Sequence, residues 1–300
     1  MDDETLFKKR IKRNFIFYLV YSLYILLNLL PHSAASFLFS SLALFLFFIL
    51  KKVRSTMIAN LNYVYGISPS HKKFAFQNFL NLSRNAVDFL RLKKLCLNKK
   101  IIIRREEIFQ NALKIGNGVI FISGHLGAWE LIPAYLSEKG YPINVVTRTV
   151  YEPKLGNLID NIRQSKGMNI IDRKVSLKES FKALKRGESL GVLIDQDTGS
   201  KGVFIQFLGR RAFTPTGIVK LAMKTKSSVI PMAIHRERDS HIIDVDHPLK
   251  FVLTGNKEMD IMNNTALCSN AVEKFIRTYP EEWVWMHRRW KRKPDKRKDE

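Results

Sequence analysis

The stretch that decides the fold is residues 118–130, which read Gly118-Val-Ile-Phe-Ile-Ser-Gly-His125-Leu-Gly-Ala-Trp-Glu130. Its first half, Val119 to Ile122, is a short run of apolar and β-branched residues of the kind that forms a buried strand. Glycines at 124 and 127 follow, and a helix-like pattern runs from Leu126 to Lys139. A strand, a glycine-containing loop and a helix in this order indicate the start of an α/β unit.

The same alternation continues downstream of this unit. Further strands are predicted over residues 143–146, 190–194, 229–234 and 242–245. Helices are predicted over 153–166, 177–186, 214–225 and 264–278, with Thr214 as the cap and Pro215 as the first helical residue of the third. Upstream, residues 56–95 have apolar side chains at helical spacing. The chain is therefore predicted to be α/β, with a mixed, mostly parallel sheet flanked by helices.

The N-terminus has the pattern of a membrane anchor. A basic cluster at 8–13 precedes an apolar run over 15–30, and Pro31 and His32 separate this run from a second one over 34–50. Each run is slightly shorter than the roughly 20 residues of a lone span, and no small-x-small cleavage site ends the first run as in a secretory signal. Residues 1–54 are predicted to form a helical hairpin in the cytoplasmic leaflet, or one tilted span with an interfacial helix.

Two further features bear on that anchor. The second apolar run ends at Lys51, Lys52 and Arg54, so basic residues flank both outer ends and place them on the cytoplasmic side. The alternative is a pair of buried core helices, which is disfavoured because Leu42 to Leu50 is apolar around the whole helix circumference.

Composition limits the possible partners. The 300 residues include 50 Lys and Arg against 27 Asp and Glu, and a 46% hydrophobic content excludes disorder for most of the chain. The net charge of +23 implies an anionic partner. Nucleic acid is discounted because no zinc-finger spacing, RNP-like block or helix-turn-helix signature is present. The acid-free stretch 91–105 is either a solvated face or a surface docked on anionic headgroups.

The candidate catalytic residues lie where the first strand ends, because ligands of open α/β sheets bind beyond the carboxyl ends of strands. His125 and Glu130 lie five positions apart and can meet only if the intervening segment is a loop entering a helix. A carboxylate on one imidazole nitrogen fixes the tautomer, so that the other nitrogen can take a proton from a hydroxyl. The alternative is a structural histidine beside a surface glutamate. Neither cysteine lies in an activating motif and no His/Cys cluster has ligand spacing, so no metal or other cofactor is predicted.

The sequence around His125 and Glu130 resembles that of a known protein family. The segment ending in His-Leu-Gly-Ala-Trp-Glu130 is similar to the His-x-x-x-x-Glu/Asp block of the bacterial lipid A late acyltransferases, the lauroyl and myristoyl transferases of the lysophospholipid and glycerolphosphate acyltransferase group. Similar blocks follow in the same order nearly to the end of the chain: Asp195-Gln-Asp197-Thr-Gly, Lys201 to Arg210, Phe213-Thr-Pro-Thr-Gly217 and Trp283 to Pro294. The resemblance implies a glycerolphosphate-acyltransferase-like catalytic domain over 55–290. A charged tail over 291–300 is expected to be disordered.

The resemblance also implies an activity. It is acyl transfer from acyl carrier protein to a hydroxyl of a lipid A precursor, at the cytoplasmic face of the bacterial inner membrane. His125 would be the general base and Glu130 its orienting partner. Arg163 and the backbone N–H groups at Gly127 and at the start of the following helix are candidates for stabilising the oxyanion. The expected partners are the carrier protein, the lipid A precursor and an anionic membrane surface, with no nucleic acid.

Other residues are left with two interpretations each. Arg163 could instead be a surface residue paired with Asp160. Asp195 and Asp197 correspond to the family's aspartate block but could simply cap a turn. Lys201 and Arg210 could meet acceptor phosphates or lie in a solvated loop. Three tryptophans suit either an interfacial belt or a core: Trp283, Trp285 and Trp290. Alternative functions are acylation of another phospholipid or glycolipid, and a membrane scaffold without catalysis.

Overall fold

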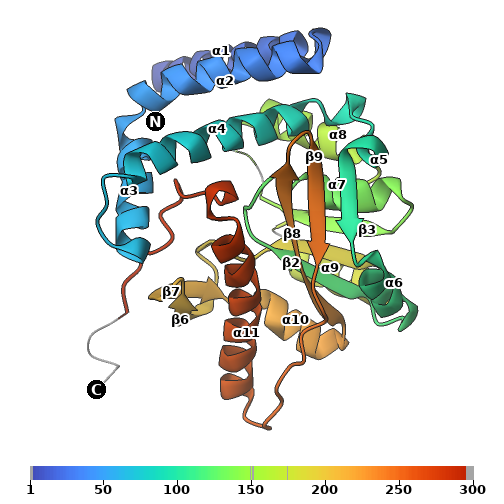
Figure 1. Cartoon of the computed structure of the whole chain (residues 1–300). Coiled ribbons are helices and arrows are strands. Elements are labelled where there is room, and N and C mark those ends of the chain that lie inside the picture. The colour runs from blue at the N-terminus through green and yellow to red at the C-terminus, as the bar shows by residue number, and fades with distance from the viewer. Residues whose placement is uncertain (1–2, 149, 151, 174, 295–300) are drawn as a thin grey trace.

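The computed structural model describes residues 3–148, 150, 152–173 and 175–294, without the side chains of 3–9 and 12. Helices cover both faces of a seven-stranded sheet, and an N-terminal pair of helices lies across one end of the molecule (Figure 1). The sheet has the order β1-β9-β8-β2-β5-β3-β4. Its strands are β1 (Ile101–Arg104), β2 (Val119–Ser123), β3 (Ile143–Thr147), β4 (Asn169–Asp172), β5 (Ser189–Leu193), β8 (Ser228–Glu237) and β9 (Ser240–Val245).

The predicted mixed, mostly parallel sheet is confirmed. Strands β8, β2, β5, β3 and β4 form a parallel series, whereas β9 returns antiparallel to β8 and β1 pairs parallel with β9. All five residues of β2 are buried, as expected for a central strand covered on both faces. One core contains side chains of α6 (Glu106–Lys114), α7 (Leu131–Glu138) and α8 (Pro153–Gln164). The other contains side chains of α9 (Ser176–Lys185), α10 (Gly217–Thr225) and α11 (Lys257–Thr278).

The predicted helical region over 56–95 has different boundaries. It is two helices, α3 (Lys51–Tyr65) and α4 (His71–Leu90), because Gly66 and Pro69 interrupt it. The basic stretch after α4 is not one secondary-structure element. It forms a 3₁₀ turn (Leu92–Lys94), the short helix α5 (Leu97–Lys100) and edge strand β1.

The predicted helix start at Thr214-Pro215 is wrong. These residues end strand β7 (Arg210–Pro215), which forms a two-stranded hairpin with β6 (Gly202–Phe207). The hairpin turns at Leu208 and Gly209, which both have positive φ. The buried side chain of Thr214 accepts a hydrogen bond from Arg289 instead of capping a helix. Helix α10 begins at Gly217, after Thr216.

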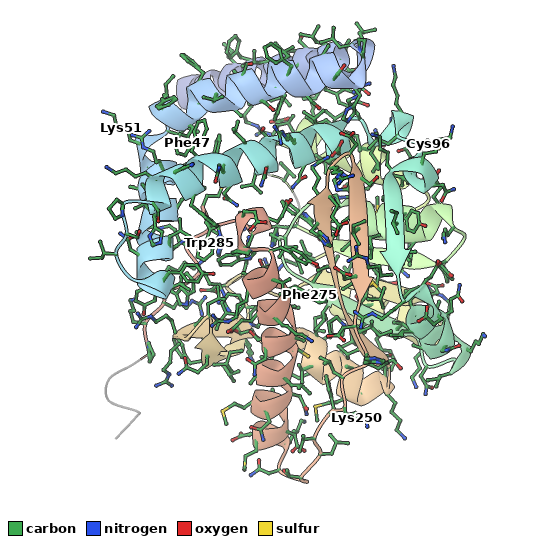
Figure 2. The ribbon with its side chains drawn as sticks, viewed as in Figure 1. Phe47, Lys51, Cys96, Lys250, Phe275 and Trp285 are labelled. Atoms are coloured by element: carbon green, nitrogen blue, oxygen red, sulfur yellow. The ribbon has the colours of Figure 1, made fainter. Side chains whose placement is uncertain are left out.

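The N-terminal hairpin consists of α1 (Asp3–Leu29) and α2 (His32–Ile49). Helix α2 packs along α4, and Phe47 points from α2 onto Phe76 and Phe79 (Figure 2). The outer face of the hairpin is exposed and apolar: six side chains are 61–77% exposed, at Phe15, Leu19, Leu29, Phe37, Phe45 and Phe48. Among the described residues, only His32–Ile49 is long and apolar enough to cross a membrane, and Arg13–Leu29 is a shorter apolar helix. As far as its side chains are described, the hairpin is therefore packed on one side.

The tail predicted to be disordered, 291–300, lies mostly outside the described residues, which end at Pro294. Within its described part, Lys291 and Arg292 form ion pairs with the buried carboxylate of Asp197. The start of the tail is thus attached to the segment that follows β5.

Candidate active site

His125 lies directly beyond the carboxyl end of β2, as the sequence predicts. The predicted helix start at Leu126 is wrong: Leu126 forms an antiparallel bridge with Trp283, and α7 begins at Leu131. The side chain of His125 is 23% exposed, and the ring of Trp129 packs against it edge-on at 5.1 Å. Gly127 allows the loop to turn, with φ at +60°. A Cβ at Gly127 would lie 1.9 Å from the carbonyl oxygen of Ile234, so only glycine fits against β8 here.

The carboxylate that orients His125 comes from Asp195, just after β5. His125 Nδ1 donates to Asp195 Oδ1 at 2.8 Å, and the His125 backbone N–H donates to Oδ2 at 2.9 Å. The indole Nε1 of Trp283 donates to the same Oδ2 at 2.7 Å. These three donors hold a fully buried carboxylate in one orientation.

This pairing sets the ionisation of both partners. Burial opposes the charge on Asp195, but the charge and hydrogen bonds of His125 and the bond from Trp283 lower the pKa of Asp195 to about 2. Burial also opposes the charge on His125. There the charge and hydrogen bond of Asp195, with the charge of Glu130, raise the pKa of His125 above 6.5. Since Nδ1 donates to Asp195, neutral His125 has Nε2 free to accept a proton. Among the described residues, Nε2 has no hydrogen-bond partner.

The predicted role of Glu130 as the hydrogen-bonded partner of His125 does not match this geometry. Glu130 accepts two hydrogen bonds from Arg163, at 2.6 and 3.0 Å. The reason is positional: the loop turns so that Nδ1 faces the next strand, while Glu130 lies at the start of α7 and meets α8. Arg163 also contacts Asp160 at 3.4 Å, so the surface ion pair considered from sequence is present, but the bidentate bond to Glu130 is the closer one.

Gly127 cannot supply its backbone N–H to an oxyanion as predicted, because that N–H donates to the carbonyl of Glu282 at 3.0 Å. The next three N–H groups, of Ala128, Trp129 and Glu130, have no hydrogen-bond partner among the described residues. Three such groups in a row at the start of a helix can hold negative charge.

Three other candidates do not contact His125. Asp197 is buried, accepts from the N–H of Gly199 at 2.9 Å and pairs with Arg292 at 3.0 Å, so of the two aspartates only Asp195 contacts His125. Arg210 donates to the carbonyl of Tyr63 and stacks over that ring at 4.6 Å, which ties the β6–β7 hairpin to α3. Lys201 is exposed, and no side-chain contact within the described part of the chain assigns it a role.

The C-terminal block is core rather than interface. Trp283, Trp285 and Trp290 are all buried, so the interfacial-belt interpretation is wrong and the core alternative is confirmed. The segment runs beside the His125 loop: Val284 N–H donates to the His125 carbonyl at 3.0 Å. His287 lies near enough for the charges of Asp195 and His125 to act on it, and burial lowers its pKa, which favours a neutral ring. Spacing in the sequence held no signal for these contacts.

A known protein family matches nearly the whole chain. The model of the bacterial lipid A biosynthesis acyltransferase family covers residues 4–292. The chain belongs to this family. It is 33% identical over 155 residues to the lipid A biosynthesis lauroyltransferase of Escherichia coli K12, an alignment that covers 49% of each chain. It is 26% identical over 203 residues to a lipid A biosynthesis acyltransferase of Haemophilus influenzae, which covers 66% of this chain and 61% of that protein. The chain thus spans about half to three fifths of the length of these relatives.

Proposed function

We propose that this protein is a membrane-bound O-acyltransferase of lipid A biosynthesis that moves a fatty acyl chain from the thioester of acyl carrier protein to a hydroxyl of a lipid A precursor. The observation that carries the proposal is His125, held through Nδ1 by buried Asp195 at a strand end, with Nε2 unpartnered among the described residues. Membership of the lipid A family supports the acceptor class.

The reaction needs one base and one site for negative charge. Nε2 of His125 removes the proton of the acceptor hydroxyl as its oxygen attacks the thioester carbon. The new C–O bond forms, the C–S bond breaks, and the proton passes from His125 to the departing thiolate. The acceptor supplies the nucleophile, so no acyl-enzyme is required. The unpartnered N–H groups of Ala128, Trp129 and Glu130 are proposed to hold the oxyanion, with Arg163 beside them.

A lysine-lined groove supports the proposal that the acyl donor is an acidic protein. The groove lies between α9 and α10 and has a volume of about 740 Å³. Its lining includes apolar side chains such as Phe181 and four lysines, Lys178, Lys182, Lys220 and Lys224. Lys178 and Lys220 have no acidic partner among the described residues, so their charge is available to an acidic carrier protein.

The function is tested by incubating the purified protein with a lipid A precursor and a donor, and then identifying the lipid product by mass spectrometry. The donor is acyl carrier protein or coenzyme A, each loaded with the same acyl chain. We expect the precursor to gain one acyl chain, and faster from the carrier protein. Transfer from coenzyme A alone would contradict the carrier as donor. Transfer to a phospholipid but not to the precursor would contradict the acceptor.

We propose that the hairpin lies in the plane of the membrane surface with its outer face in the cytoplasmic leaflet. Its inner face is already occupied, because α2 packs along α4 and Ser40 bonds Ser83 across the two helices. A spanning α2 would bring α4 and its buried Asp88 toward the hydrocarbon, which is costly for a charged group. The exposed phenylalanines on the outer face suit insertion among acyl chains.

Replacing Phe37 and Phe45 together by Glu is therefore expected to lower binding to anionic phospholipid vesicles at least about tenfold, since burial of each ring contributes roughly 1.5–3 kcal/mol. Sedimentation with vesicles measures this. The matched control is Val252→Glu with Leu253→Glu, exposed apolar residues beside Lys250 at the end of the molecule away from the hairpin (Figure 2). Equal loss of binding in both variants would contradict the hairpin as the bound surface.

Arg163→Lys is expected to lower kcat about tenfold, because lysine keeps the charge but loses the planar fork that meets both oxygens of Glu130. Steady-state kinetics measure the change. Arg186 is a suitable control, since it makes the same bidentate contact with Glu188 on the surface, so Arg186→Lys should leave kcat within about twofold. If kcat of Arg163→Lys equalled that of Arg186→Lys, the proposed role of Arg163 in the site would be wrong.

A further inference from the structure

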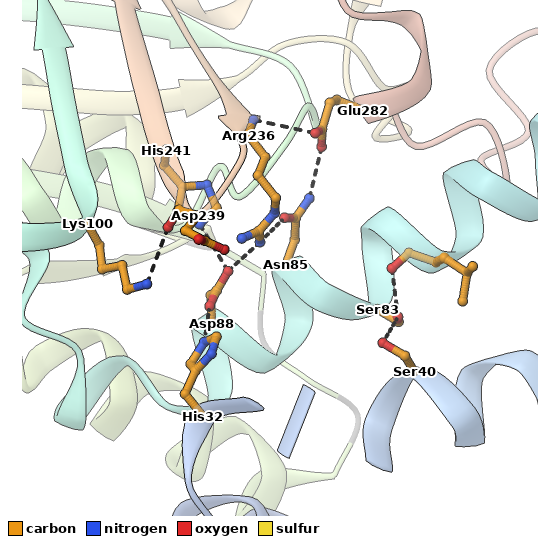
Figure 3. Close-up of polar contacts among 11 residues, drawn as sticks. His32, Ser40, Ser83, Asn85, Asp88, Lys100, Arg236, Asp239, His241 and Glu282 are labelled. Carbon is orange, nitrogen blue, oxygen red and sulfur yellow. Dashed lines mark hydrogen bonds and ion pairs between the residues drawn. The ribbon is translucent and has the colours of Figure 1, made fainter. Parts of the chain in front are cut away.

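A buried carboxylate on α4 joins the N-terminal hairpin to the sheet. Asp88 is almost fully buried and accepts hydrogen bonds from three side chains (Figure 3). His32, the first residue of α2, donates from Nε2 to Oδ1 at 2.9 Å. His241 of β9 donates to Oδ2 at 3.0 Å, and Arg236 of β8 donates to the same oxygen. Burial opposes the charge, but the bonds from His241 and His32 and the charge of Arg236 hold the pKa of Asp88 well below its usual range.

The same arginine leads to a second buried acid, Glu282. Arg236 donates through Nη2 to Asn85 Oδ1 at 2.9 Å, and Asn85 Nδ2 donates to Glu282 Oε2 at 3.2 Å. The backbone N–H of Arg236 donates to Glu282 Oε1 at 3.4 Å. Figure 3 shows these contacts converging from α4, β8 and the segment after α11. The side chain of Glu282 is thereby fixed by two elements of the core.

Glu282 in turn lies against the catalytic loop. Its carbonyl accepts the Gly127 N–H at 3.0 Å, and Trp283 forms an antiparallel bridge with Leu126. The next residue, Val284, donates to the His125 carbonyl at 3.0 Å. Trp283 also donates to Asp195. Residues 282–284 therefore hold the backbone of the His125 loop and one oxygen of its partner carboxylate.

At the other end, the hairpin turn is tied to α4 by more than His32. Arg91 donates to the carbonyl of Leu27, in the last turn of α1, and to that of Leu30, which follows the helix. Asn28 donates to the carbonyl of Leu90 at 3.1 Å. The hairpin turn and the C-terminal end of α4 thus form one hydrogen-bonded unit.

We propose that Asp88, Asn85 and Glu282 couple the seating of the N-terminal hairpin on α4 to the position of the His125 loop, with Glu282 as a positioning residue for His125. The link contacts neither substrate nor the reacting atoms. It acts by fixing the backbone that sets the distance from His125 to Asp195, and displacements of about 1 Å in such a geometry are costly for catalysis. The hairpin is then part of the active-site framework as well as a membrane-binding surface.

The test uses the full-length protein in detergent micelles with ¹³C-labelled histidine. NMR titration of the ring signals measures the pKa of His125, identified among the seven histidines by its absence from H125Q. Glu282→Gln removes the charge beside Asn85 and Arg236. We expect the pKa of His125 to fall, because the loop moves away from Asp195, and kcat to fall about tenfold at unchanged KM. Glu281→Gln, the same change at the exposed neighbouring residue, should alter neither.

The hairpin end is tested by His32→Ala, which removes one bond to Asp88 and leaves the outer face intact. We expect the pKa of His125 and kcat to fall as in Glu282→Gln, with unchanged sedimentation on anionic vesicles. If Glu282→Gln does not fold, Asn85→Ser tests the same link with both charges in place. A folded Glu282 or Asn85 variant with the wild-type His125 pKa would overturn the positioning role. A wild-type His125 pKa and kcat in His32→Ala would overturn the coupling to the hairpin.

The proposal takes His125 as the base of the proposed reaction, but the titration needs no substrate. A wild-type protein that fails to acylate a lipid A precursor would therefore count against the proposed function and leave the coupling measurable. A normal reaction with no change in the pKa of His125 among the variants would count against the coupling alone.

Discussion

Replacing His125 by Gln is expected to lower kcat for acyl transfer by about 10²- to 10⁴-fold, the range that a positioned general base contributes. Glutamine fills similar space but cannot take a proton from the acceptor hydroxyl. Binding of the donor and acceptor depends on other surfaces, so KM should change little. The measurement is steady-state kinetics with acyl carrier protein as donor.

The matched control is His247→Gln, which makes the same change at an exposed histidine. Far-ultraviolet circular dichroism should agree between the two variants and the wild type, whereas H125Q should unfold at a lower temperature, because buried Asp195 loses its charged partner. If H125Q keeps kcat within about threefold of the wild type, another group must accept the proton, and the base assignment would be wrong.

The sequence predicted strand β2 and the turn after it because their signals are local. The apolar run over Val119–Ile122 and the glycines after it determine a strand end and a turn within a dozen residues. His125 could therefore be placed at the carboxyl end of β2 from sequence. The partner of its Nδ1 could not, because Asp195 follows the neighbouring strand, 70 positions away.

The pairing of Glu130 with Arg163 instead of His125 could not be predicted for the same reason. Which carboxylate faces His125 depends on how the loop is held, and the hydrogen bonds that hold it come from residues 282–284 near the other end of the chain. Buried Trp283 donates to Asp195, a contact that composition and spacing cannot reveal. The motif itself favoured Glu130, since it lies nearest in sequence.

The β6–β7 hairpin was missed for a different reason. Thr214 followed by Pro215 is a good local signal for a helix start. Tertiary contacts override it, because pairing with β6 and the hydrogen bond from buried Arg289 keep Thr214 in an extended strand. Helix α10 then begins two residues after Pro215.

The second large effect is expected for Asp195→Asn. Asp195 accepts from three donors: His125 N–H, His125 Nδ1–H and Trp283 Nε1–H. An asparagine has only one side-chain oxygen, so its NH₂ group faces a former donor. His125 then avoids the clash by placing its proton on Nε2, which is the nitrogen that must accept the hydroxyl proton. We expect kcat to fall about 10³-fold or more in the variant.

The pH dependence separates this effect from simple misfolding. In the wild type, Asp195 raises the pKa of His125 above 6.5. The protonated imidazolium, which cannot accept a proton, therefore persists to higher pH. We expect kcat to rise with pH through the pKa of His125. Loss of the negative charge in Asp195→Asn lowers the pKa of His125, so the residual activity should appear at lower pH than in the wild type.

Asp197→Asn is the matched control, because Asp197 is also buried but pairs with Arg292 instead. It should lower stability while the pH profile of kcat stays in place. A shifted profile in Asp197→Asn, or an unshifted one in Asp195→Asn, would contradict the pairing of Asp195 with the catalytic base.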